Sequence, residues 1–152
     1  MQQNSGFRIY DVKCTQEINP DELLELIVLD KPGEVTITSP KDARAVLFYV
    51  FGGGGGGGGG NTNVNDVYSG GGGGGGSGRM KNKFVSLIPS IQQEYTINIG
   101  AGGSGGDVGN DGEDGAPTSI KIGATRVLFA RGGKKGLAPT KGDLTEGTAK
   151  GG

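Results

Sequence analysis

The chain has 152 residues, of which 35 are glycine, whereas glycine usually makes up about 7% of a protein. Only 32% of the residues are hydrophobic and none is tryptophan, so the side chains for a large core of ordinary density are missing. Fifteen basic and sixteen acidic residues leave a net charge of -1, which provides no basic surface for nucleic acid and no polybasic route to a membrane. The absence of histidine excludes most hydrolase and zinc-enzyme schemes, so we expect neither an enzyme nor a cofactor.

The N-terminal residues carry no targeting signal that we recognise. Residues 1–6 contain no charged segment followed by an apolar one, and no apolar run approaches the ~20 residues that span a bilayer. We therefore expect neither a signal peptide nor membrane insertion. Cys14 is the single cysteine, and we expect it to be a small buried hydrophobic residue in a protein made in a reducing cytosol.

The first 51 residues contain two glycines and have the pattern of a conventional folding sequence. Residues 7–12 are rich in strand formers and predict a strand. Residues 19–22, Asn-Pro-Asp-Glu, are a helix-start signal. Residues 26–29 are apolar and are followed by Asp-Lys-Pro-Gly, which suits a type II turn, so we expect them to pair with residues 35–38 as a hairpin.

A second turn is predicted at residues 39–42, and the strand that follows, residues 44–51, is apolar at almost every position. Such a run indicates a strand that is buried on both faces. Glycine-rich segments then alternate with further predicted strands. The glycine segments are residues 52–60, 70–76 and 100–115, and the strands are residues 84–88, 95–99, 119–122 and 127–130.

The glycine segments are not placed as linkers, because each follows one strand and leads into another within a single small sheet region. Polyglycine can form an extended helix of the polyproline II type with three residues per turn, and its backbones can approach closely. Ordering the sixteen residues of the two pure runs costs roughly 16–32 kcal/mol. Each hydrogen bond returns only about 1 kcal/mol net. We therefore expect the runs to be held by flanking strands or by other subunits.

One segment has a weak metal-binding pattern. Residues 102–107 match the start of the calcium-binding repeat GGxGxD, and Asp107, Asp111 and Asp114 are the candidate ligands. The motif occurs once, whereas a calcium-binding roll needs stacked copies. We therefore favour a solvated acidic turn over a metal site.

The order of these elements resembles the glycine-rich domains of bacteriophage tail fibres and related virion appendages. The residues that carry the resemblance are a strand and proline turn at 35–40, the apolar strand and polyglycine from residue 46, and the motifs at 95–103, 110–120 and 130–136. The resemblance covers residues 34–136. It implies a β-rich domain whose glycine segments gather at one end or face, often in a trimer, and which serves structure or host-receptor contact.

We therefore expect an all-β fold, a small β-sandwich or β-prism-like domain with ordered polyglycine segments that is completed by oligomerisation. The expected divisions are an N-terminal attachment segment (1–33), the glycine-rich domain (34–136) and a tail (137–152). The hypothesis is a virion subunit, a tail fibre, fibre tip or decoration protein, that forms a homotrimer with a polyglycine core shared between subunits. It would bind other virion proteins and a host receptor, the latter through Asn61, Asn63, Asn65 and Tyr68.

Two alternatives of other classes remain open at this point. One is a self-assembling extracellular filament subunit unrelated to phage, in which a heterologous contact between copies would give fibres. The other is an ice-binding polyglycine bundle, for which the sequence lacks a short and regular repeat.

Overall fold

The computed structural model describes residues 26–60, 71–88 and 90–139. The chain divides into two compact units, Met1–Asp30 and Lys31–Gly152, and the description below concerns the second unit. The predicted strand at 7–12, the helix start at 19–22 and Cys14 lie outside the described residues.

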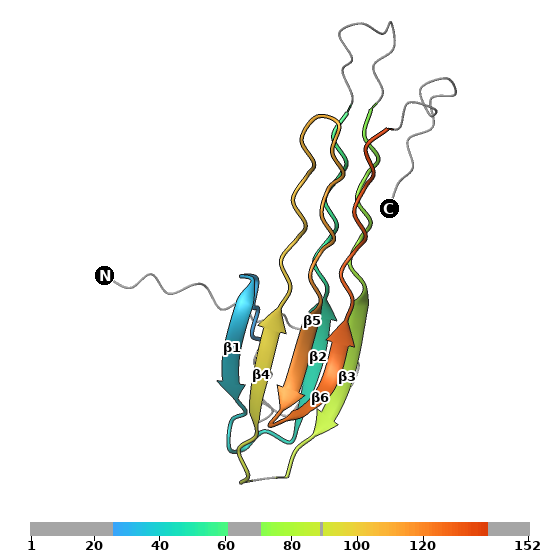
Figure 1. Cartoon of the computed structure of the whole chain (residues 1–152). Coiled ribbons are helices and arrows are strands. Elements are labelled where there is room, and N and C mark those ends of the chain that lie inside the picture. The colour runs from blue at the N-terminus through green and yellow to red at the C-terminus, as the bar shows by residue number, and fades with distance from the viewer. Residues whose placement is uncertain (1–25, 61–70, 89, 140–152) are drawn as a thin grey trace, which may run out of the picture. The chain divides into compact units, whose positions relative to one another are not determined.

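Six strands form two antiparallel sheets (Figure 1). The larger sheet has the strand order β1-β4-β5-β6, and the smaller one pairs β2 with β3. The described residues contain no helix, so the expected all-β class is confirmed. The strands are β1 (Gly33–Thr38), β2 (Ala45–Phe51), β3 (Met80–Ser86), β4 (Glu94–Ile99), β5 (Thr118–Ile122) and β6 (Thr125–Ala130).

The core lies between the inner faces of the two sheets. On β4, alternation of apolar and polar residues buries Tyr95 and Ile97 and turns Thr96 and Asn98 away. The ring of Tyr95 meets that of Phe48 on β2 edge to face, with centroids 4.9 Å apart. The buried core is small, as the composition predicted, and consists of Phe48, Val50, Tyr95, Ile97, Ile120 and Ala130.

The predicted hairpin between residues 26–29 and 35–38 is wrong. Residues 26–29 form no strand, and β1 pairs instead with β4, where Val35 lies opposite Ile97 and Ile37 opposite Tyr95. This pairing places Val35 and Ile37 of β1 against the core. The predicted turn after β1 is confirmed by the hydrogen bond from the Ala43 N–H to the Pro40 carbonyl, 3.2 Å.

The prediction that β2 is buried on both faces is also wrong for the single chain. Phe48 and Val50 face the core, but Leu47, Tyr49 and Phe51 are more than half exposed on the other side. The reason is that no third layer of the described residues covers the β2–β3 sheet. In the parts of the chain that the structure describes, no helix is long and apolar enough to cross a bilayer.

Candidate functional site: the glycine bundle and its tip

Five glycine-rich segments extend from the same end of the two sheets and form what we call the glycine bundle (Figure 1). Each segment continues a strand: g1 follows β2, g2 leads into β3, g3 follows β4, g4 leads into β5 and g5 follows β6. The segments are g1 (residues 52–60), g2 (71–78), g3 (100–107), g4 (110–116) and g5 (131–138).

Buried Thr118, the first residue of β5, joins the sheets where the bundle begins. Its hydroxyl donates to the Phe51 carbonyl at the end of β2 (2.6 Å) and accepts from the Gly100 N–H after β4 (3.0 Å). These two bonds fix the starting points of g1 and g3 relative to β5. Nothing in the sequence pattern singled out this threonine.

The hydrogen bonds of g1 repeat every three residues, as expected for an extended threefold helix. The N–H groups of Gly52, Gly55 and Gly58 donate to carbonyls of Arg79 and g2. Those of Gly53, Gly56 and Gly59 donate to carbonyls of g4. The g1 carbonyls accept hydrogen bonds from g3 and g5, again at a spacing of three residues. Representative bonds are Gly55 N–H to Gly76 O (2.8 Å), Gly56 N–H to Glu113 O (2.8 Å), Gly106 N–H to Gly57 O (2.8 Å) and Gly136 N–H to Gly56 O (2.8 Å).

Segment g1 is therefore the centre of the bundle, because it bonds to all four other segments. The outer segments also bond to one another, g2 to g5, g5 to g4 and g4 to g3, as in Gly76 N–H to Lys134 O (2.7 Å) and Glu113 N–H to Ser104 O (2.9 Å). All of these bonds lie within one chain. The segments of a single chain thus pair with each other, and the polyglycine core shared between subunits stays a prediction.

Close approach explains why the centre must be glycine. Gly56 is buried, and a Cβ atom there would overlap the backbone carbonyl of Ser104. No side-chain movement can relieve such an overlap, because the obstructing atoms are backbone. The same restriction applies at inward positions of the other segments, for example Gly75, Gly112, Gly133 and Gly136.

The prediction that the sequence lacks a short and regular glycine repeat is wrong. Glycine occupies every third position from Gly100 to Gly115, namely residues 100, 103, 106, 109, 112 and 115. Residues between them carry side chains that point away from g1, such as Ser104 and Glu113, which are exposed. A three-residue glycine period with polar residues between indicates the outer member of a threefold-helix bundle.

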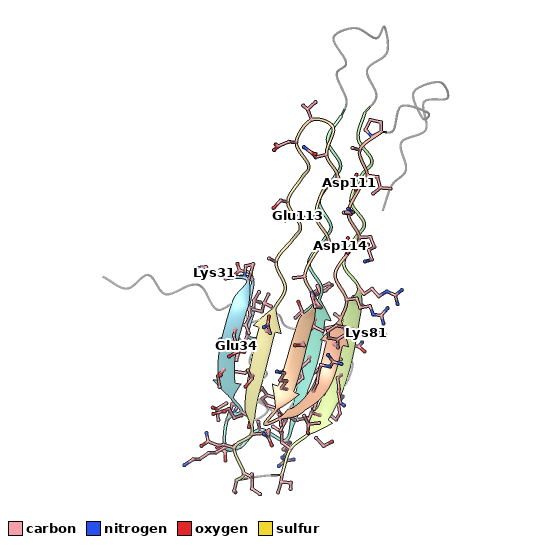
Figure 2. The ribbon with its side chains drawn as sticks, viewed as in Figure 1. Lys31, Glu34, Lys81, Asp111, Glu113 and Asp114 are labelled. Carbon is pink, nitrogen blue, oxygen red and sulfur yellow. The ribbon has the colours of Figure 1, made fainter. Side chains whose placement is uncertain are left out.

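Two ion pairs join g4 to g5 on the outside of the bundle (Figure 2). The Lys134 ammonium lies 2.6 Å from Asp114, and the Lys135 ammonium lies 2.8 Å from Asp111. Backbone N–H groups of Lys135 and Ala138 donate to the same two carboxylates. These bonds from lysine and backbone hold the pKa of both Asp111 and Asp114 below its usual value, and the Asp111 carboxylate raises the pKa of Lys135.

The candidate calcium ligands do not form a common site. The carboxylates of Asp111 and Asp114 face lysines, and Asp107 lies on g3 rather than g4. Among the described residues, no group of three or more His, Cys, Asp or Glu side chains could hold a metal ion. Asp111 and Asp114 of g4 therefore act as partners of the g5 lysines.

The end of the bundle farthest from the strands, which we call the tip, contains two chain connections. Residues 107–110 turn from g3 into g4, with Gly109 at a φ of 77° and its N–H bonded to the Gly60 carbonyl (2.9 Å). Val108 is 65% exposed there. The predicted contact residues Asn61, Asn63, Asn65 and Tyr68 lie outside the described residues, but Gly60 and Gly71, which bracket them, belong to g1 and g2.

A family model described as a glycine-rich domain matches residues 30–152. The chain belongs to this family. The match begins at the boundary of the second compact unit, so the two sheets and the bundle together constitute the glycine-rich domain. No curated protein and no solved structure matches the chain.

Proposed function

We propose that this glycine-rich domain is a non-enzymatic structural part of a bacteriophage virion, a tail fibre, fibre tip or decoration subunit, that presents its tip to the host surface. The observation that carries the proposal is that all five glycine segments extend from one end of the sheets, with the turn at residues 107–110 and its exposed Val108 at their far end. The resemblance of residues 34–136 to phage appendage domains supplies the biological context.

The architecture suits a spacer with a variable end. Backbone hydrogen bonds hold the bundle, so its rigidity does not depend on which side chains the tip carries. Changes in residues 61–69 or in the turn at 107–110 would alter the tip without altering the packing around Gly56. Asparagine side chains both donate and accept hydrogen bonds, and a tyrosine adds an apolar ring, so Asn61, Asn63, Asn65 and Tyr68 suit a polar host-surface molecule.

The remaining parts of the proposal concern assembly. The domain would be made in the host cytoplasm and incorporated into the virion, with residues 1–33 attaching it to another virion protein. The resemblance alone implies a homotrimer, and this stoichiometry is not part of the proposal.

The test is binding of the purified, fluorescently labelled chain to bacterial cells. Replacement of residues 61–69 by a Gly-Ser segment of equal length should abolish binding. A matched control, Lys121→Ala, changes an exposed residue of β5 remote from the tip and should bind like the natural chain. Unchanged binding after replacement of the insert would overturn the receptor role and leave a purely structural one, and electron microscopy that shows long fibres instead of particles would favour the filament alternative.

A further inference from the structure

The outer face of the β2–β3 sheet is a continuous apolar surface. Leu47 lies opposite Phe84, and Phe51 lies opposite Met80, so their side chains are on the same side of the sheet. Tyr49 stands between them on β2, opposite Asn82. The exposed fractions are 52% for Leu47, 58% for Tyr49, 62% for Phe51, 55% for Met80 and 64% for Phe84.

The size of this surface is large for a monomer. A fully exposed aromatic residue presents roughly 150–250 Å², so the five residues together leave on the order of 400–600 Å² of apolar area open. That value reaches the upper end of the largest patches on monomers, about 300–600 Å². Two such faces pressed together would bury roughly 800–1,200 Å², which approaches the size of a specific interface.

Segments g1 and g2, which continue the two strands of this sheet into the bundle, carry almost no side chains. Segments g1 and g2 extend β2 and β3, and their exposed positions are Gly54, Gly71, Gly74, Gly75 and Ser77. At Gly75 an added Cβ would overlap the Gly55 carbonyl. A Cβ atom would meet nothing within 4 Å at Gly71 or Gly74, and its nearest neighbour at Gly54 would be 3.9 Å away. Glycine is thus retained where the single chain leaves room for a side chain, although glycine costs more conformational entropy than alanine.

The surface also lacks charge, which restricts what can cover it. The outer sides of the other described strands and segments carry charged residues, among them Glu34 on β1, Lys121 on β5 and Asp114 on g4. Figure 2 shows Glu34 beside β1 and Asp114 on the bundle. The other large apolar residues that are exposed in the described part of the chain lie outside the strands, at residues 26–29 and at Ile88, Ile91, Val108 and Leu137. The apolar sheet surface that matches this face is therefore the same face of another copy.

We propose that this face pairs with the same face of a second copy of the chain about a two-fold axis parallel to the strands. In that arrangement the apolar part of one copy covers the apolar part of the other, and the glycine part faces the glycine part. Such a contact is isologous and closes as a dimer. It also accounts for the apolar residues at alternate positions of β2 that the single chain leaves open.

Sedimentation equilibrium of the full chain tests the proposal. The natural chain should be a dimer at roughly 100 μM, where a micromolar interface is populated. Phe84→Arg and Gly74→Arg should each weaken dimerisation at least 10-fold, the first by placing a charge in the apolar part and the second by placing a long side chain where the copies approach. The single chain has room for both changes, so circular dichroism and the thermal midpoint should remain those of a folded protein.

Ser104→Arg is the matched control, because Ser104 is an exposed bundle residue outside the face, and this variant should remain a dimer. A monomeric natural chain, a trimer, or dimers that persist in both face variants would each overturn the proposal. The result is independent of the host-surface role, since residues 61–69 are unchanged in these variants and cell binding can be measured on each of them.

Discussion

Replacement of Gly56 by alanine should destabilise the domain far more than the same replacement two residues earlier. Gly56 is buried at the centre of g1, and its added Cβ would overlap the backbone of Ser104 on g3. Because the obstacle is backbone, g3 has to move away from g1. Gly54 differs only in its surroundings, since the nearest atom to an added Cβ is 3.9 Å away.

The magnitude follows from the hydrogen bonds between g1 and g3. Two bonds join these segments, from Gly103 to Gly54 and from Gly106 to Gly57, and a third joins Gly109 in the turn after g3 to Gly60. At about 0.5–1.5 kcal/mol net each, their loss would lower the free energy of unfolding by roughly 1.5–4.5 kcal/mol. Alanine also reduces the entropy of the unfolded chain, which stabilises by about 0.4–1 kcal/mol, but this gain is the same for both variants.

Urea unfolding followed by circular dichroism measures the difference directly. With a slope of about 1–3 kcal/mol per molar urea, the midpoint of Gly56→Ala should fall by on the order of 1 M. The midpoint of Gly54→Ala should stay within error or rise slightly. Equal stability of the two variants would refute the close packing of g1 against g3.

Two further outcomes are expected. Asp111 and Asp114 have pKa values below the ordinary one, so their contribution to stability is present above the unfolded pKa of about 4 and is lost as the pH falls through the folded values. Thermal melts should therefore show that Asp111→Asn/Asp114→Asn lowers the melting temperature at neutral pH but not at about pH 2; an equal loss at both would contradict the ion-pair account. Tyr95 has a buried hydroxyl with no partner among the described residues, so Tyr95→Phe should be neutral or stabilising by up to about 2 kcal/mol, and a clear loss in urea unfolding would show that the hydroxyl is paired.

The strands could be predicted because the residue pattern that indicates each strand lies within the strand itself. Alternating residues of β4 and the apolar run of β2 are visible within six or seven positions, and both strands occur where expected. The partner of β1 could not be predicted in the same way, because β4 lies about 60 residues further along the chain. The nearby Pro32-Gly33 signal favoured a local hairpin, but pairing with β4 places Val35 and Ile37 against the core.

The sequence predicted that the glycine segments are ordered, but it did not predict which segments lie next to one another. The sequence indicated extended, ordered glycine segments, and the energetic argument required partners for them. It did not show that g1 has four neighbours in its own chain, since a pure glycine run has no pattern that distinguishes inward from outward residues. The acidic residues of g4 suggested a metal site because their lysine partners lie on g5, about 20 residues away in the sequence.

Residue-resolved amide hydrogen exchange across g1 distinguishes an ordered threefold bundle within one chain from a flexible glycine run. The N–H groups of Gly52, Gly53, Gly55, Gly56, Gly58 and Gly59 donate to carbonyls of other segments and should exchange slowly, while those of Gly54 and Gly57, which have no acceptor among the described residues, should exchange faster. This account predicts a protection pattern with a period of three residues. Uniformly rapid exchange of all nine glycines would contradict it and would show that the run is a flexible linker.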